Sequence, residues 1–315
     1  MTPPRARGFV LLAVLWVMVG VGTIGLGLAL LARRAVGVAH NRRAEAIAMW
    51  LAEDCASRAE AAIGAALDHR GGDTESSSEA AQATWSRLDA AVAASPLLSG
   101  TPCDLTIRPT GTTIDINTAD DSLLSRLFVA LGSSATAADS LTDAILDWRD
   151  ADDVPRPTGA ESAWYRAQGR APPRNASFAD VRELASVRGF EVRTGLDSVL
   201  GVEADRILLS RAPLAVVAAL PGFTSEAVAR VADHRALGSP VPDIVSLGAE
   251  LSPAGRSTLL ANYPDVVRLT TSEPDAWLLM AHGTAGRPAV TFVLELRLVR
   301  AGNRAAVVRR RTWIQ

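Results

Sequence analysis

The sequence predicts an α+β fold: a long N-terminal helix packed on an antiparallel sheet, with a large all-helical insertion within that sheet. Residues 9–32 are uncharged, and an amphipathic helical pattern follows from residue 44. Alternating apolar residues, typical of strands, occur at 103–107 and 114–116 and return near the C-terminus. Residues 117–266, which lie between the strand regions, hold helix caps and turns. Since part of a sheet does not bury its apolar face alone, both strand regions should join in one sheet against the long helix.

The composition excludes several function classes. The 315 residues have a net charge of −2, so no global charge draws the chain to nucleic acid or acidic membranes. Two cysteines are too few for a zinc site, which needs four ligands, and the four histidines are scattered. The sequence holds no HExxH, GxSxG or P-loop pattern. The standard hydrolase and nucleotide-binding signatures are therefore missing.

The first helix begins with a segment that can cross a membrane. Residues 9–32 (FVLLAVLWVMVGVGTIGLGLALLA) would extend roughly 36 Å as a helix, enough for a bilayer. The run is too long for the apolar core of an ordinary secretory signal, and no cleavage pattern directly follows it. A plain signal anchor explains this much. The short leader that ends in Gly8 before Phe9 more specifically resembles a type IV prepilin leader, which a prepilin peptidase cuts between these two residues.

The helix then continues as an amphipathic one. Its apolar stripe recurs mostly at every fourth position, at Ile47, Leu51, Cys55, Ala59, Ile63 and Leu67. After a loop (RGGDTESSSEAAQ), Cys103 starts a half-buried strand, and the turn at 109–111 predicts a first hairpin. With Cys55 on the helix stripe and Cys103 on the strand, the two cysteines either form a disulfide in an oxidising compartment or remain two small buried side chains.

The insertion consists of short capped helices. Two pairs have the spacing of capping boxes: Thr118 with Asp121, and Ser177 with Asp180. The LPGF turn at 220–223 joins two helices, of which Thr224 caps the second, and this unit resembles a helix-hairpin-helix. The C-terminal segment returns to β-branched alternation, with a hairpin turn at 301–303.

The whole pattern resembles the K-type minor pseudopilins of type II secretion systems, the general secretion pathway protein K family. The resemblance rests on the Gly8-Phe9 leader and on the stretches IDINTA, ILDWRDADDVPRPTGAE, FADVRELASVRGF and APLAVVAALPGF with VADHR behind it. One departure is LSRAPL, where the family more usually has NTAPL. The resemblance implies a pilin-like body with an inserted domain of helix-hairpin-helix, SAM-like repeats. It also implies that the protein is not an enzyme.

The resemblance also implies a domain order, a location and partners. The ranges are a leader at 1–8, a transmembrane helix at 9–32, an amphipathic helix and first hairpin at 33–116, a helical insertion at 117–266 and completing strands at 267–315. The protein would cross the inner membrane once, with a cytoplasmic N-terminus and a periplasmic body. Its expected partners are the I- and J-type minor pseudopilins, the major pseudopilin and the prepilin peptidase. Together with the other minor pseudopilins it would cap the tip of the periplasmic pseudopilus and help to initiate assembly.

A single residue agrees with a tip position. Most pilin-like helices carry Glu as the fifth residue of the mature chain, where it neutralises the N-terminal amine of a neighbouring subunit. Counted from Phe9, the fifth residue here is Ala13. Placing a carboxylate within the bilayer costs roughly 2.5–3.5 kcal/mol. We therefore expect one only where a neighbouring subunit supplies an opposite charge. A leading subunit has no neighbour above it.

The stretch DWRDADDVPRPTGAE is the candidate metal site. Five carboxylates against two arginines give a local charge of −5 + 2 = −3: Asp147, Asp150, Asp152, Asp153 and Glu161. The spacing suits an EF-hand in part, but Val154 and Pro155 stand where an oxygen ligand and Gly are needed. Oxygen ligands crowded on a loop favour Ca²⁺, and known K-type pseudopilins bind calcium in their helical domain. We therefore expect the five residues to act as a pool of Ca²⁺ ligands, not all used at once; the alternative is a solvated acidic loop.

Two other functions remain open from the sequence. A membrane-anchored helix-hairpin-helix protein of a related pilus or DNA-uptake system would bind nucleic acid through its turn. Arg230 and Arg235 lie there, but Glu226 and Asp233 make the surface mixed instead of basic, so no nucleic-acid partner is expected. A membrane-anchored metal-dependent hydrolase would need a His or Ser constellation, which the sequence does not offer.

Overall fold

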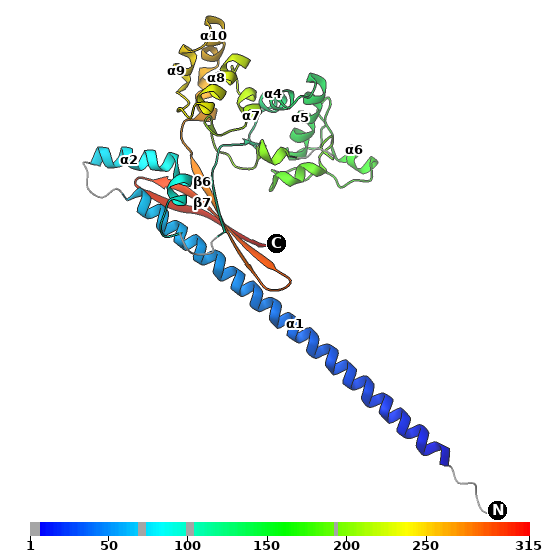
Figure 1. Cartoon of the computed structure of the whole chain (residues 1–315). Coiled ribbons are helices and arrows are strands. Elements are labelled where there is room, and N and C mark those ends of the chain that lie inside the picture. Colours follow the sequence, from blue (N-terminus) through cyan, green and yellow to red (C-terminus); the bar gives the residue numbers. More distant parts are fainter. Residues whose placement is uncertain (1–6, 69–73, 99–103, 192–194) are drawn as a thin grey trace, which may run out of the picture.

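The computed structural model describes residues 7–68, 74–98, 104–191 and 195–315 (Figure 1). The helices are α1 (Arg7–Leu67), α2 (Thr74–Ser86), α3 (Leu88–Ala93), α4 (Asp121–Ala130), α5 (Ala135–Arg149), α6 (Ser162–Ala167), α7 (Leu214–Ala219), α8 (Ser225–Ala236), α9 (Ile244–Ala249), α10 (Pro253–Ala261) and α11 (Tyr263–Leu269), with 3-10 turns η1 (Val181–Ser186) and η2 (Leu196–Ser198). The strands are β1 (Asp104–Pro109), β2 (Ile114–Asp115), β3 (Leu200–Gly201), β4 (Ile207–Leu208), β5 (Thr270–Thr271), β6 (Ala276–Ala285), β7 (Val290–Ala301) and β8 (Arg304–Ile314).

Helix α1 is a rod of 61 residues that carries the rest of the molecule on its C-terminal end (Figure 1). Its most apolar stretch has a mean hydropathy of 2.3 over 18 residues, none of them buried. By length and composition the helix can cross a membrane. From Leu11 onward the first buried residue is Ala44, so this part of the apolar stretch makes no contribution to the folded core.

The antiparallel sheet has the order β1-β6-β7-β8, and one face packs on the C-terminal half of α1. Two tryptophan side chains form hydrogen bonds within this core. Trp85 Nε1 donates to the Pro274 carbonyl at 2.8 Å, and Trp277 Nε1 donates to the Trp85 carbonyl at 3.0 Å. The pairing of β1 with β6 joins chain segments that the helical insertion separates, as the sequence predicts. The predicted C-terminal hairpin is also present, since Ala301 pairs with Arg304 across a turn at Gly302.

The face that α1 presents to the sheet differs in part from the predicted stripe. Cys55 and the apolar residues after it on the stripe are buried, but Ile47 and Leu51 are 43% and 39% exposed. Alanines take their place, because strand β6 approaches the helix backbone closely. A Cβ on Gly283 would lie 1.9 Å from the Ala48 carbonyl oxygen. Contact at this end is therefore set by small side chains and a glycine, which an apolar periodicity does not reveal.

The predicted first hairpin is wrong. Strand β1 pairs with β6 in the main sheet, whereas β2 pairs in parallel with β3 inside the helical lobe. Gly111, at φ 76°, redirects the chain between them, and a Cβ there would lie 2.1 Å from the Arg206 carbonyl oxygen. The turn therefore carries the chain out of the sheet and into the lobe instead of folding it back.

The helical lobe has its own apolar core and stands beyond the sheet on the side away from α1 (Figure 1). Its helix caps match the sequence analysis in part. Thr224 caps α8 as predicted, accepting a hydrogen bond from Ala227 N. Asp120 instead of Thr118 caps α4, and Asp180 forms a capping box with Glu183 on η1 instead of one with Ser177.

Ion pairs attach the lobe to the sheet. Arg297 of β7 contacts the carboxylates of Glu203 at 3.1 Å and Asp205 at 2.5 Å. Arg309 of β8 contacts Glu203 at 2.6 Å. Because these side chains are mostly buried, the pairs are less screened than surface pairs and hold the β3–β4 connection against the sheet.

Candidate metal centre

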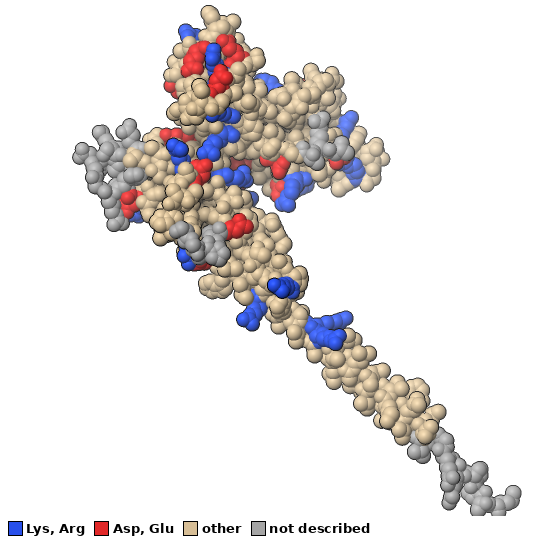
Figure 2. Space-filling view, viewed as in Figure 1, with Lys and Arg blue, Asp and Glu red and all other residues tan. Residues whose placement is uncertain are grey.

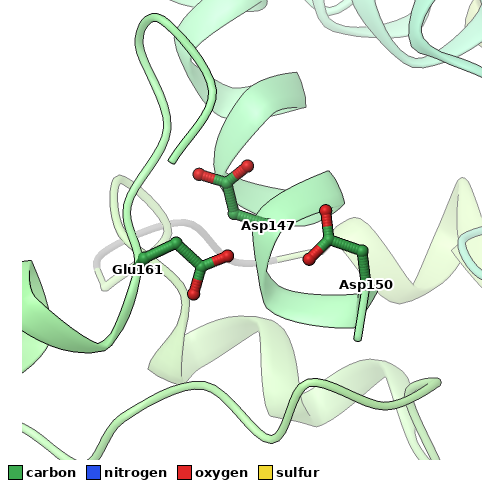
Figure 3. Close-up of side chains that lie close together, drawn as sticks. All are labelled: Asp147, Asp150 and Glu161. Carbon is green, nitrogen blue, oxygen red and sulfur yellow. The ribbon is translucent and has the colours of Figure 1, made fainter. Parts of the chain in front are cut away.

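Three of the five predicted carboxylates converge at the C-terminal end of α5. Asp147 lies in its last turn and faces the core, Asp150 caps the helix, and the loop returns so that Glu161 precedes α6. One ligand oxygen from each of the three residues lies within 4.8 Å of those of the other two. In Figure 3 the side chains of Asp150 and Glu161 point toward each other, and Asp147 lies between them with its carboxylate turned toward the returning loop. Asp147 is fully buried and Glu161 is 2% exposed.

The returning loop is shaped around Asp147. Both of its carboxylate oxygens accept a hydrogen bond from Arg156 N at 3.2 Å. Gly159 passes so close that a Cβ there would lie 2.0 Å from Asp147 Oδ2. A side chain at position 159 would thus occupy the space of the carboxylate, which explains the glycine in the GAE motif.

Asp152 and Asp153 lie at the margin of the cluster. Both are exposed. The Asp152 carboxylate accepts a hydrogen bond from Val154 N at 2.9 Å, and that of Asp153 accepts one from Ser162 N at 3.2 Å. Asp153 also lies beside Glu161 and contributes to raising its pKa. Among the described residues, the Asp152 side chain therefore stabilises its own turn, whereas Asp153 lies next to the three converging carboxyl groups.

Burial dominates the electrostatics of this cluster. It raises the pKa of Glu161 to about 7, with the Asp147 and Asp150 charges adding to the effect. It raises the pKa of Asp147 to about 6, against the opposing hydrogen bond from Arg156 N. The pKa of Asp150 is raised as well, by burial and by Asp152. Three neighbouring carboxyl groups that resist ionisation therefore lower the stability of the folded chain when no ligand binds them.

Unsatisfied oxygens indicate what the cluster lacks. Asp150 Oδ1 and both Glu161 oxygens are buried and receive no hydrogen bond from the part of the chain that the structure describes. Asn175, which the sequence analysis did not select, donates from Nδ2 to the Asp152 carbonyl, and its Oδ1 is likewise buried without a partner. Carboxylate and amide oxygens are hard ligands that suit Ca²⁺ or Mg²⁺ and not zinc or copper. The donor set therefore fits a hard divalent cation.

The stretch VRELASVRGF contacts and supports the acidic stretch DWRDADDVPRPTGAE. Arg188 of VRELASVRGF donates from Nη1 to the Gly159 carbonyl at 2.8 Å, and its backbone N–H donates to the Tyr165 hydroxyl at 2.9 Å. Trp148 packs edge-on against Tyr165, with ring centroids 5.4 Å apart. The two motifs are therefore one structural unit, in which an aromatic layer and an arginine hold the acidic loop.

The comparisons with known proteins agree with this architecture. Residues 107–195, which include the acidic loop and both motifs, match the family model described as type II secretion system (T2SS), protein K. The predicted resemblance to the K-type minor pseudopilins is confirmed for this part of the chain. The fold of the chain is similar to a chain of the GspK-GspI-GspJ complex from the enterotoxigenic Escherichia coli type 2 secretion system, with a TM-score of 0.54 and 16% identity over 89% of this chain and 99% of that chain. A search of the curated proteins finds no match.

The K-type proteins are structural components of a secretion system and not an enzyme family. The helix-hairpin-helix region of this chain is also unsuited to DNA. Arg235 donates to the Leu209 carbonyl, and Arg230 pairs with Asp233 at 3.5 Å. The Glu226 carboxylate accepts a hydrogen bond from Ser252 N. Glu226 lies near the start of α8, where a phosphate would have to approach. The nucleic-acid alternative is therefore not favoured.

Proposed function

We propose that this pseudopilin caps the tip of the periplasmic pseudopilus and helps to initiate its assembly. The observation that carries the proposal is the position of the helical lobe. It stands on the side of the sheet away from α1, near the C-terminal end of that helix, and projects sideways from the helix-and-sheet body (Figure 1). Copies stacked along a thin helical fibre would bring each lobe against the body of the next subunit. One copy at the leading end avoids this clash.

The proposed partners are the I- and J-type minor pseudopilins, with the major pseudopilin below them. The similar solved structure is a complex of GspK with GspI and GspJ, which supports the first two. The apolar N-terminal helix is compatible with a single inner-membrane anchor, and we propose a cytoplasmic N-terminus and a periplasmic body. Because α1 already begins at Arg7, prepilin peptidase cleavage between Gly8 and Phe9 would leave a helix that starts at the new terminus.

Fibre labelling tests the tip position. Copies carrying an electron-dense tag on the C-terminus should be found once per pseudopilus, at one end. Overproduction should shorten or stop the fibres, because each additional cap ends a growing polymer. Tags at regular intervals along the fibre would refute the proposal.

We further propose that Ca²⁺ binds Asp147, Asp150 and Glu161, with Asp153 at the margin, and stabilises the helical lobe. The ion would supply the positive charge that the buried oxygens lack. At a hundredfold excess over the dissociation constant the gain is about 2.7 kcal/mol. Thermal unfolding with EDTA, Ca²⁺ and Mg²⁺ tests this, with Ca²⁺ expected to raise the melting temperature most. The Asp150→Asn variant should lose the effect and Asp152→Asn should keep most of it; identical melting curves in all three solutions would refute the site.

A further inference from the structure

The segment of α1 between the apolar stretch and the body carries a group of arginines that the functions above do not use. They are Arg33, Arg34, Arg42 and Arg43, here called the basic collar. All four are exposed. No Asp or Glu occurs before Glu45. Figure 2 shows basic side chains and no acidic ones on this part of the rod.

The collar surrounds the helix instead of marking one face. At 3.6 residues per turn, the four positions point to about 0°, 100°, 180° and 280° around the axis. A partner helix would contact charges along a single stripe. A layer that encloses the rod on all sides would contact all four.

The axial positions match a membrane surface. Arg33 follows Ala32, the last residue of the uncharged run, without a spacer. The headgroup layer is about 5–8 Å deep on each side of the hydrocarbon core, so the first pair of arginines lies within it. The second pair lies about 14 Å further along the helix. Helical side chains lean toward the N-terminus, which here is the membrane, and long arginine side chains extend back to the interface. The second pair therefore stays within a Debye length of about 8 Å of the headgroups.

We infer that the basic collar binds the phosphates of anionic phospholipids in the leaflet beside the body. The inference rests on the membrane anchoring proposed above. The arginines would hold the subunit at a fixed depth, with Ala44 and the sheet clear of the surface. They would also add an electrostatic barrier to the extraction of the subunit from the bilayer during assembly.

The test uses the full chain in bilayer nanodiscs of about four parts phosphatidylcholine to one part phosphatidylglycerol, an anionic surface that attracts basic segments. The lipids that stay on the protein after release into mild detergent are identified by native mass spectrometry. We expect phosphatidylglycerol to be enriched about threefold over its share of the bilayer. Changing the four collar arginines to Gln should return the ratio to that of the bilayer. The matched control changes four exposed arginines of the helical lobe to Gln: Arg166, Arg174, Arg230 and Arg268.

Three outcomes decide the matter. Enrichment that the collar variant loses and the control keeps supports the collar. Enrichment absent from the unmodified chain, or unchanged in the collar variant, overturns it. A collar variant that keeps its lipids but no longer binds the partner pseudopilins also overturns it, and assigns the arginines to a protein. Extraction of the unmodified chain from membranes by alkaline carbonate would instead refute the membrane anchor itself.

Discussion

The acidic cluster should make the metal-free protein less stable as the pH rises from about 5 to about 8. The pKa values of Glu161 and Asp147, about 7 and about 6, lie above their ordinary values of 4.5 and 3.8. In this range the folded state still holds protons that the unfolded state has already released. Raised carboxyl pKa values therefore favour folding at low pH, and that contribution is lost as the pH passes through the folded values.

The magnitude follows from the shift and the spacing. A carboxyl pKa raised from 4.5 to about 7, as at Glu161, corresponds to about 3 kcal/mol. The rise at Asp147 from 3.8 to about 6 corresponds to a similar amount. Because the oxygens lie within 4.8 Å of one another, the two groups titrate as a pair and the terms do not add fully. We expect a total loss of about 3–5 kcal/mol in the free energy of unfolding of the helical lobe.

Urea unfolding of a soluble body that begins at residue 33 measures this, since from Leu11 onward the first buried residue is Ala44. With EDTA, the lobe should unfold at a lower urea concentration at about pH 8 than at about pH 5. Calcium should remove most of the difference. The Glu161→Gln variant should be more stable than the unmodified protein at the higher pH without metal, and insensitive to calcium. A metal-free protein that gains stability with rising pH, or a Glu161→Gln variant that loses it, would show that the carboxylates already have internal partners.

Three further predictions concern the helix and its ends. Gly283→Val should cost about 3 kcal/mol or more by urea unfolding, because a Cβ there meets the backbone of α1, whereas Gly64→Ala, with open space around it, should stabilise the helix by up to about 1 kcal/mol. Cys55 is disulfide-bonded and its Sγ lies 3.9 Å from the Asp104 carbonyl oxygen; Cys103 lies outside the described residues, and we predict that it is the partner. Thiol labelling without reductant should leave both cysteines unmodified, and Cys55→Ser should cost about 3–4 kcal/mol. Co-expression with a prepilin peptidase should give a mature chain that begins at Phe9, and an intact leader in the mass spectrum would count against the pilin-type processing.

The fold could be predicted where residue patterns have a single physical meaning. An uncharged run of membrane length specifies a transmembrane helix. Apolar residues at a period near four specify an amphipathic helix, and strict alternation specifies a strand. The pairing of β1 with the C-terminal strands followed because neither region could bury a sheet face alone. The predicted first hairpin failed because Gly111 serves an interdomain turn, and a Pro-Thr-Gly sequence is equally compatible with a hairpin. The contact at Gly283 was hidden because alanine and glycine carry little apolar signal.

The candidate site could be located but not resolved. Residue type and crowding selected all five carboxylates, and three of them converge: Asp147, Asp150 and Glu161. Sequence spacing could not tell that Asp152 would bond to its own turn, because that depends on the direction of the loop after α5. Asn175 gave no signal, since an isolated amide far along the chain becomes relevant only when its φ of 49° and its buried oxygen are seen.

The most direct test of the central claim is the assembly state of the soluble body with the soluble bodies of the I- and J-type minor pseudopilins from the same genome. Size-exclusion chromatography with light scattering on the mixture measures the mass of the complex. A tip subunit should give one complex that contains a single copy of each protein, and the complex should persist on dilution. Three separate monomers, or a complex of the I- and J-type proteins that excludes this chain, would contradict the tip function.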